Sequence, residues 1–380
     1  MKIGVITYWY GNDNYGMLLQ CWALQQYLKD KGHSPYVIRY RGEGSLVKKK
    51  IKGWLASLLN FFSATKREDA RRKIRLLSYN AEKNKIRKFE EFRQQNLNMT
   101  SNYYARLSDL RKNPPAADCY IAGSDQIWVS PLRLLDSWAY FLDFGEKNIR
   151  RISYAPSFGQ QGYPKNNLKK LKKALALFDY ISCRENDGVK TCKQLGFNAV
   201  KVEDPTLLLP CERYFQLCEP IKYENHVFIY SVNMVNAEDI YWSVLKQNFA
   251  NNDIVITPAS GNSIGSELFG KDVKYVYATP GQWLSLIKAS RLVVTSSFHG
   301  VLFCILFNKR FAYVPLTSRY SSSNNRITDL LNALSLNSVI VKCPEDYSRI
   351  MNIDFSWESI NYRKSDLIKL SKSYLEKSLC

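Results

Sequence analysis

The sequence is short of the residues that build metal sites and disulfide scaffolds. Its 380 residues include only three histidines and nine cysteines, an odd number, and no two cysteines have the C-x-x-C spacing. This composition argues against a zinc finger, a thioredoxin-like redox pair and a disulfide-rich miniprotein. We therefore predict that the protein has no metal site and that several of its cysteines are small buried hydrophobes in a reducing compartment.

Long apolar runs are also missing. No segment reaches the roughly 18 apolar residues that a membrane-spanning helix needs. The amino-terminal stretch 1–16 turns polar after about ten residues, so it lacks the apolar core and the cleavage site of a signal peptide. These features predict a cytoplasmic protein, which could touch the inner face of a membrane without crossing it.

Acidic residues are outnumbered by basic ones. The chain has 54 Lys and Arg against 34 Asp and Glu, a formal net charge of +20. Such a surface attracts an anionic partner, which could be a nucleic acid, an anionic membrane face, or a phosphorylated or acidic substrate. Because the basic residues concentrate in one segment and no known nucleic-acid-binding motif is present, we expect no nucleic-acid partner.

Along most of the chain, β-branched runs alternate with helical patterns. The runs that we predict as strands are 3–7, 36–40, 119–122, 151–155, 180–183, 226–233, 253–260, 272–278, 291–297 and 311–315. This alternation predicts an α/β protein with two Rossmann-like, doubly wound domains that face a ligand cleft. We place these domains at 1–210 and 220–350, followed by a final helix within 355–380.

One segment breaks the alternation. Residues 44–93 carry fifteen Lys and Arg against five Asp and Glu, and we predict a basic helical insertion over about 44–113. Within it, 51–66 has the pattern of an amphipathic helix, which could lie on an anionic membrane. The alternative is a helix whose apolar face packs on the domain while its charges are solvated.

Loops that follow parallel strands are where this kind of fold binds its ligands. Ser124, Asp125 and Gln126 follow a predicted strand, and these side chains suit the recognition of sugar hydroxyls. Asp125 could also act as a general base, or it could simply cap the next segment. The loop that contains Asn14 could present N–H groups to an anion, or it could be a turn that needs its glycines.

Two later loops carry groups that suit anion binding and proton transfer. Arg184 follows a predicted strand, where its guanidinium either pairs with Glu185 or Asp187 or binds a phosphate or carboxylate. His299 begins a very apolar helix directly after a strand, so the helix amino terminus should favour an anion beside it. A histidine at this place either exchanges a proton with a substrate or caps the turn.

These blocks together resemble the polysaccharide pyruvyl transferases. The segments that carry the resemblance, in family order, are NYGMLLQCWALQQYLKDKGHSPYVI, DCYIAGSDQIW, RISYAPSFG, SCREND, DPTLLL, TSSFHGVLFCILFNKRFAYVP and NNRITDLLNALSL. They cover nearly the whole chain up to about residue 340. Where many members have Arg-Leu-His, this chain has Ser297, Phe298 and His299.

The resemblance implies a fold similar to the GT-B glycosyltransferases. It also implies transfer of a pyruvyl group from phosphoenolpyruvate to a sugar of a polysaccharide or of its lipid-linked precursor, with no cofactor. The catalytic residues would be His299 and Asp125. The donor would contact Arg184, Ser296, Ser297, His299, Gly300 and Arg326, with Arg319 and Lys309 as further candidates to replace the missing arginine. The acceptor would contact Asn14, Tyr15, Ser124, Asp125 and Gln126.

Two other functions fit the same residues. A GT-B glycosyltransferase that uses a nucleotide sugar would have the same fold and the same cleft. A homologue that binds a saccharide or a membrane without catalysis would fit if the missing arginine reflects lost chemistry. Binding of phosphoenolpyruvate or of a nucleotide sugar would separate these possibilities.

Overall fold

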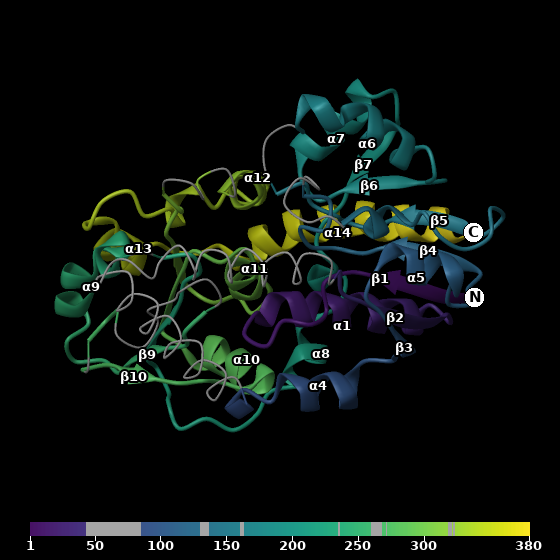
Figure 1. Cartoon of the computed structure of the whole chain (residues 1–380). Coiled ribbons are helices and arrows are strands. Elements are labelled where there is room, and N and C mark those ends of the chain that lie inside the picture. The colour runs from purple at the N-terminus through teal and green to yellow at the C-terminus, as the bar shows by residue number, and fades with distance from the viewer. Residues whose placement is uncertain are drawn as a thin grey trace, which may run out of the picture.

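A computed structural model provides the structure of the chain (Figure 1). It describes residues 1–42, 85–129, 137–159, 163–234, 236–259, 268–270, 272–317, 321 and 324–380. The amphipathic helix that we predict within 51–66 and the candidate Arg319 therefore lie outside the described residues, as does most of the basic segment 44–93.

The amino-terminal half is built on a five-stranded parallel sheet with the strand order β3-β2-β1-β4-β5. Its strands are β1 (Lys2–Ile6), β2 (Ser34–Tyr40), β3 (Met99–Tyr104), β4 (Cys119–Ala122) and β5 (Arg150–Ser153). A parallel pair, β6 (Ile181–Cys183) and β7 (Ala199–Lys201), adjoins β5, because the amide of Ser153 donates to the carbonyl of Tyr180. The helices of this half are α1 (Tyr15–Asp30), α4 (Phe89–Asn96), α5 (Leu107–Lys112), α6 (Leu168–Leu175) and α7 (Asn186–Gln194).

The carboxyl-terminal half repeats this plan with the strand order β10-β9-β8-β11-β12, again parallel. Its strands are β8 (Val227–Tyr230), β9 (Ile254–Ile256), β10 (Lys274–Tyr275), β11 (Leu292–Thr295) and β12 (Phe311–Tyr313). Its helices are α8 (Cys211–Phe215), α9 (Trp242–Asn248), α10 (Pro280–Ala289), α11 (Phe298–Leu306), α12 (Asn325–Ala333) and α13 (Asp346–Asn352). The two sheets confirm the predicted α/β architecture of two Rossmann-like halves.

Local sequence explains where the key helices begin and end. Helix α1 ends just before Gly32, whose φ of 79° is the left-handed conformation that glycine adopts freely. Thr279 caps α10 and forms a capping box with Gln282. Helix α11 is buried along its whole length, because it is apolar on all sides and lies between the two halves.

Two strands were missed by the sequence patterns. β3 lies inside the stretch 44–113, so the part of the predicted helical insertion that the structure describes contains a strand as well as helices. β3 is a polar edge strand that pairs only with β2, and it therefore lacks the apolar alternation of a half-buried strand. β7 has three residues at the edge of a two-stranded pair, which is too short for any periodicity to register.

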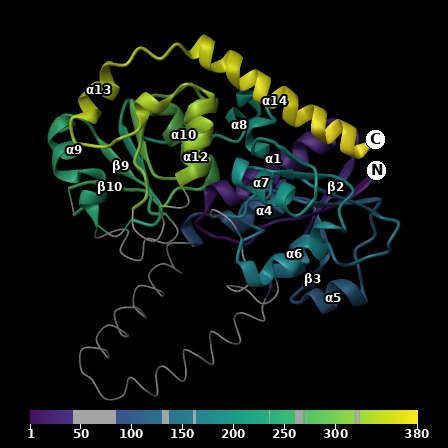
Figure 2. The same cartoon turned by 90° about the horizontal axis from the view of Figure 1, so that it is seen from above.

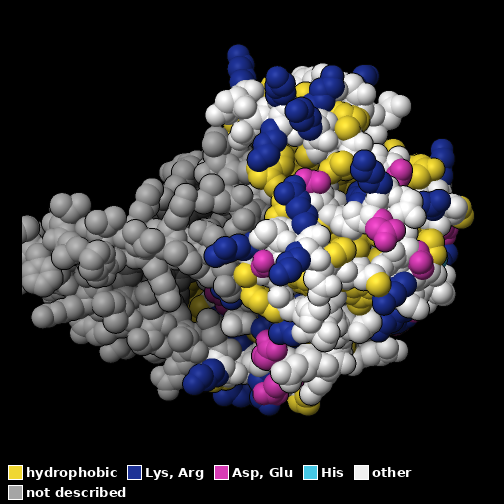
Figure 3. Space-filling view, turned by 45° about the vertical axis from the view of Figure 1, so that its right-hand side comes forward, with side chains coloured by type: hydrophobic (Ala, Val, Ile, Leu, Met, Phe, Trp, Pro, Cys, Tyr) yellow, Lys and Arg dark blue, Asp and Glu magenta, His cyan; other side chains and the backbone are white. Residues whose placement is uncertain are grey.

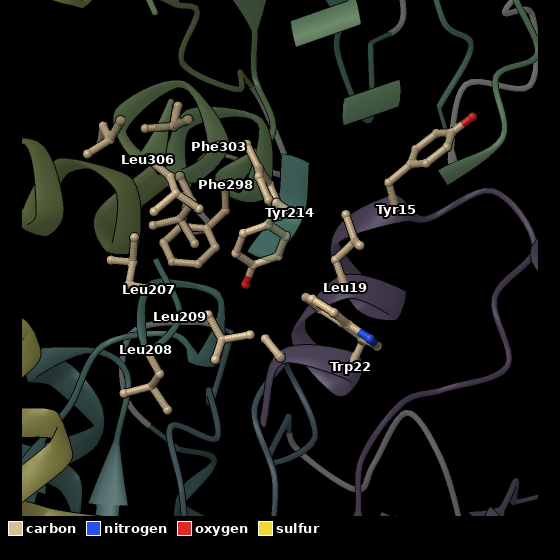
Figure 4. Packing of buried hydrophobic residues seen from close by; sticks show 14 of the residues in the cluster. Tyr15, Leu19, Trp22, Leu207, Leu208, Leu209, Tyr214, Phe298, Phe303 and Leu306 are labelled. Atoms are coloured by element: carbon tan, nitrogen blue, oxygen red, sulfur yellow. The ribbon is translucent and has the colours of Figure 1, made fainter. Parts of the chain in front are cut away.

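The two halves share a continuous apolar core. Tyr15 at the start of α1 reaches into the carboxyl-terminal half, where its ring stacks on Trp283 with a centroid distance of 5.1 Å. Figure 4 shows the neighbouring part of this core, in which Trp22 of α1 and Phe303 of α11 approach Tyr214 from opposite sides. The interface between the halves is thus packed like the interior of a domain.

The last helix ties the halves together. α14 (Trp357–Leu379) starts beside the carboxyl-terminal half, where Arg363 donates to the carbonyl of Leu334, and it ends along the amino-terminal half (Figures 1 and 2). There the Tyr374 hydroxyl donates to the carbonyl of Ser153 at 2.8 Å. The predicted carboxyl-terminal helix therefore packs across both halves.

Candidate active site

The carboxyl ends of β4, β6 and β11 meet at one buried carboxylate, Asp204. Its Oδ2 accepts a hydrogen bond from the Ser124 hydroxyl at 2.8 Å and another from Nη1 of Arg184 at 2.9 Å. Nε2 of His299 lies 3.4 Å from the same oxygen, within ion-pair distance. Asp204 thus joins residues from both halves of the molecule.

The charges of this cluster stabilise one another. Burial would raise the pKa of Asp204, but His299, Arg184 and the Thr206 amide together hold that pKa well below its usual value. Burial would lower the pKa of Arg184, yet the carboxylates around it, Glu185 foremost, raise it. Both Asp204 and Arg184 are therefore charged near neutral pH, although their side chains are almost fully enclosed.

Gly16 places the first turn of α1 directly against His299. A Cβ atom at Gly16 would overlap the imidazole ring, so only glycine allows this approach. Asn14 caps the same helix end by accepting from the amide of Met17. The amino-terminal glycine loop therefore shapes the histidine site rather than a phosphate cradle.

Two arginines from different halves of the molecule share one aromatic ring. The guanidinium carbon of Arg184 lies 4.6 Å from the ring centroid of Phe298, and that of Arg326 lies 5.3 Å from it. Gln126, with its amide oxygen turned to Arg326, accepts from both terminal nitrogens of that guanidinium. Nε and Nη2 of Arg184 and Nε of Arg326 are shielded from solvent and make no hydrogen bond with any described residue.

Arg184 forms ion pairs with Asp204 and, at 3.7 Å from its Nε, with Glu185, so Arg326 is the member of the pair whose charge has no ion-pair partner among the described residues. Burial and the neighbouring charge of Arg184 lower the pKa of Arg326 to about 10. Arg326 is half-buried as a residue, while its guanidinium is enclosed. Two neighbouring guanidinium groups whose N–H donors have no hydrogen-bond partner suit a ligand with two anionic groups, such as a phosphate and a carboxylate.

Of the residues predicted to bind the acceptor, Asp125 and Gln126 lie together beside the arginine pair. Asp125 has a left-handed backbone with a φ of 77°, and its Oδ1 accepts from the amide of Gln126. Tyr8 and Tyr10 lie near enough to Asp125 for its charge to help raise their pKa values, although burial is the main cause. Asp125, Gln126 and these rings therefore form one side of the cluster.

The prediction that Tyr15 contacts the acceptor is wrong. Its side chain is fully buried between the halves, and its hydroxyl donates to the carbonyl of Ala278 while accepting from Arg87. Ser124 is likewise fully buried, and its hydroxyl is bound to Asp204. Asn14 has a capping role. Of the five residues predicted to contact the acceptor, Asp125 and Gln126 therefore remain as candidates.

The donor assignment also needs correction at the start of α11. The Ser297 hydroxyl caps the helix by accepting from the amide of Gly300, so that amide is not open to a ligand. The Ser296 hydroxyl accepts from the amide of Val232 and donates to its carbonyl, which ties β11 to β8. Lys309 follows the opposite end of α11, far along the helix from His299. Of the two candidates for the missing cation that the structure describes, Arg326 and Lys309, it brings Arg326 to the site.

Asp204 is a site residue that the sequence patterns did not single out. Asp204 precedes η5 (Pro205–Leu207) and also caps it by accepting from the amide of Thr206. A carboxylate before proline is usually only a helix cap, and its contact with His299 spans about a quarter of the chain. That contact exists only once the two halves have docked.

Metal and membrane features are reported for the described part of the chain. There, no group of three or more His, Cys, Asp or Glu side chains is placed to hold a metal ion. Among the helices that the structure describes, none is both long and apolar enough to cross a membrane.

Comparisons with known proteins identify the family and the fold of the chain. The family model described as "Polysaccharide pyruvyl transferase" matches residues 14–318, and curated protein sequences give no match. Among solved structures, a UDP-GlcNAc 2-epimerase from Methanocaldococcus jannaschii in complex with UDP-GlcNAc and UDP is 10% identical, with a TM-score of 0.51, over 95% of this chain and 98% of that chain. The corresponding epimerase from Neisseria meningitidis is 11% identical, with a TM-score of 0.42, over 97% and 99%. The likeness to the Methanocaldococcus jannaschii enzyme identifies the fold as GT-B.

Proposed function

Because the chain belongs to the polysaccharide pyruvyl transferase family, we propose that it transfers a pyruvyl group from phosphoenolpyruvate to two hydroxyls of a saccharide. The products would be a cyclic pyruvate ketal and phosphate. The observation that carries this proposal is the pair of guanidinium groups, Arg184 and Arg326, that face one ring with unpaired donors. Phosphoenolpyruvate holds a carboxylate and a phosphate close together, which matches two adjacent guanidinium groups.

His299 is the proposed proton donor. A proton delivered to the methylene carbon of the donor makes C2 electrophilic, and a sugar hydroxyl then adds to C2 and loses its own proton. Departure of phosphate and attack by the second hydroxyl on C2 close the ketal. General acid–base catalysis of this kind contributes roughly 10² to 10⁴ in rate. The scheme requires neither a metal nor an organic cofactor.

Asp204 and Asp125 have different proposed roles. Asp204 lies against His299 and Arg184, where its charge would stabilise the imidazolium and orient both side chains. Asp125 lies beside Gln126, which contacts Arg326, so its carboxylate would accept a proton from the acceptor diol near the donor. The saccharide acceptor, whether free or lipid-linked, would then enter from the side of Tyr8 and Tyr10.

Calorimetric titration tests the donor. We expect wild-type protein to bind phosphoenolpyruvate saturably, and we expect both Arg184→Lys and Arg326→Ala to weaken that binding by about tenfold or more. Arg349→Ala is the matched control, since Arg349 is an exposed arginine paired with Asp346 away from the cluster. Binding of nucleotide sugars with none of phosphoenolpyruvate would instead make the protein a glycosyltransferase on the same scaffold.

Phosphate release in the presence of saccharide acceptors tests His299. His299→Gln should abolish turnover while circular dichroism and the melting temperature stay close to wild type. If His299→Gln loses stability yet keeps its activity per folded molecule, the histidine is a structural cap and the proposed mechanism fails.

A further inference from the structure

A pocket outside the cleft lies between α5, η3 (Ser137–Phe141) and α6. Its volume is about 440 Å³, which is in the range of sites for small ligands. Trp138, Phe141 and Ala174 supply apolar lining, while Lys170 and Lys173 of α6 supply cationic lining. An apolar hollow lined by lysines suits a ligand with an anionic head and an apolar tail.

Helix α6 carries more positive charge than its own stability would favour. Lys169, Lys170, Lys172 and Lys173 are all exposed on a helix of eight residues that contains no acidic residue. Lysines three or four positions apart repel one another, and those in the first turn also oppose the helix dipole. An anionic partner would offset both effects.

Apolar side chains lie exposed around these lysines. Leu177, which also lines the pocket, is 38% exposed, and Tyr180, three residues further along the chain, is 36% exposed. Nζ of Lys170 lies 4.1 Å from the ring centroid of Trp138. Figure 3 shows Lys and Arg side chains gathered at the top of the view, over the part of the molecule that contains α6 and α7, with hydrophobic side chains between them.

The combination of lysines, exposed apolar side chains and a pocket distinguishes between two kinds of anionic partner. A nucleic acid backbone would use the lysines but not the aliphatic side chains or the pocket. A phospholipid surface uses all of them, because lysines bind the headgroup phosphates, tryptophan prefers the interfacial region and aliphatic side chains enter the acyl layer.

We propose that the α6 face, defined here as the lysines of α6 with Leu177, Tyr180 and the pocket beneath them, docks on an anionic phospholipid surface. The lysines contact the headgroups, and the pocket takes up part of an acyl chain against Trp138. This inference does not depend on the chemistry proposed for the cleft.

Flotation with lipid vesicles tests the charge. Full-length protein should bind vesicles of phosphatidylcholine mixed with phosphatidylglycerol and should not bind phosphatidylcholine alone. Lys170→Glu/Lys173→Glu should weaken binding by about tenfold or more, whereas the same charge change at two exposed lysines of the other half, Lys222→Glu/Lys274→Glu, should have little effect. Equal losses in the two double variants would overturn the proposal, because they would indicate attraction to the net charge alone.

Tryptophan fluorescence tests the pocket. Phosphatidylglycerol with brominated acyl chains should quench the wild-type emission, and Trp138→Phe should remove most of that quenching while vesicle binding persists. Quenching that is unchanged in Trp138→Phe would overturn the acyl-chain site. Binding to a single-stranded oligonucleotide that Lys170→Glu/Lys173→Glu abolishes, with no binding to anionic vesicles, would assign the α6 face to nucleic acid instead.

Discussion

Arg184 and Arg326 illustrate at the residue scale how a binding site opposes stability. Their guanidinium groups contact the same ring of Phe298, and each retains hydrogen-bond donors without a partner among the described residues. Enclosed like charges destabilise the empty protein, and a dianionic ligand removes that penalty. Stability and binding should therefore change in opposite directions when Arg326 is removed, whereas removal of Arg184 would also leave the buried carboxylate of Asp204 without its ion-pair partner.

Arg326→Met should raise the melting temperature of the empty protein. It removes the charge that burial and Arg184 disfavour, and we expect a gain of about 1 kcal/mol. The same variant should lose the thermal shift that phosphoenolpyruvate produces in wild type. Scanning fluorimetry with and without the ligand measures both effects. Arg326→Lys keeps the charge, so it should not gain stability, and a gain in that control would refute the electrostatic cause.

His226, which lies far from the site, should make the free energy of unfolding depend on pH. Its imidazole is fully buried, and burial lowers its pKa to about 4, against smaller opposing effects of the Leu286 backbone and Asp253. Since the unfolded state has the higher pKa, protonation favours unfolding. The free energy of unfolding should fall by about 2 kcal/mol as the pH falls from near 6.5 to 4.

His226→Phe should flatten this part of the pH profile. The substitution keeps an aromatic ring against Phe228 and Tyr223 and removes the titrating group. Urea denaturation at several pH values between 4 and 7 measures the slope. His33→Asn, which removes a much less buried histidine, should leave most of the slope in place. A wild-type slope that survives in His226→Phe would assign the titration to another group.

At the scale of elements, the first turn of α1 depends on its contact with α11. Alanine normally stabilises a helix by about 1 kcal/mol relative to glycine, but a Cβ atom at Gly16 would overlap the ring of His299. Gly16→Ala should therefore destabilise the protein and reduce turnover by about 100-fold, because the imidazole must move. Phosphate-release kinetics and thermal melting measure the two effects.

The control for this contact is Gly16→Ala in a protein that lacks the imidazole ring of residue 299. In the background of His299→Gly, which removes the imidazole and also the Cβ atom that lies 2.5 Å from a Cβ at Gly16, Gly16→Ala meets no side chain of residue 299, so it should be neutral or stabilising by about 1 kcal/mol. If Gly16→Ala is equally destabilising in both backgrounds, the cost comes from the backbone of α1 and not from the contact between the two helices.

Sequence patterns predicted the strands whose own residues form a clear apolar run. The apolar runs of β4 and β12 begin at the residues that the patterns indicate. β3 was missed because a polar edge strand has no apolar face to reveal it. The local rules thus fail where pairing with a neighbour, and not side-chain periodicity, decides the conformation.

The candidate site was predictable to a similar extent. The chain order of strands and loops brought Arg184 and His299 to attention, because polar groups at strand ends face the cleft. It did not reveal Asp204, whose importance depends on a contact across the halves. It misplaced Tyr15, since a tyrosine beside a glycine loop reads as a ligand contact until the opposing Trp283 is known.

At the scale of the whole molecule, the two halves are held as one unit. Apolar side chains from both belong to a single core cluster, and α14 makes hydrogen bonds to each half. An interface of this kind is packed more like a domain interior than like the polar contact between mobile domains. Unfolding should therefore be a single cooperative transition in the wild-type protein.

Tyr15→Ala should separate that transition into two. It removes a ring that stacks on Trp283 and contacts Tyr230, and it leaves Arg87 without one of its hydrogen-bond partners. We expect a cost of about 3 to 5 kcal/mol, concentrated between the halves, so differential scanning calorimetry should resolve two peaks. Tyr15→Phe keeps the ring and should keep one peak at a slightly lower temperature. A single peak for Tyr15→Ala would mean that α14 and the remaining core suffice to couple the halves.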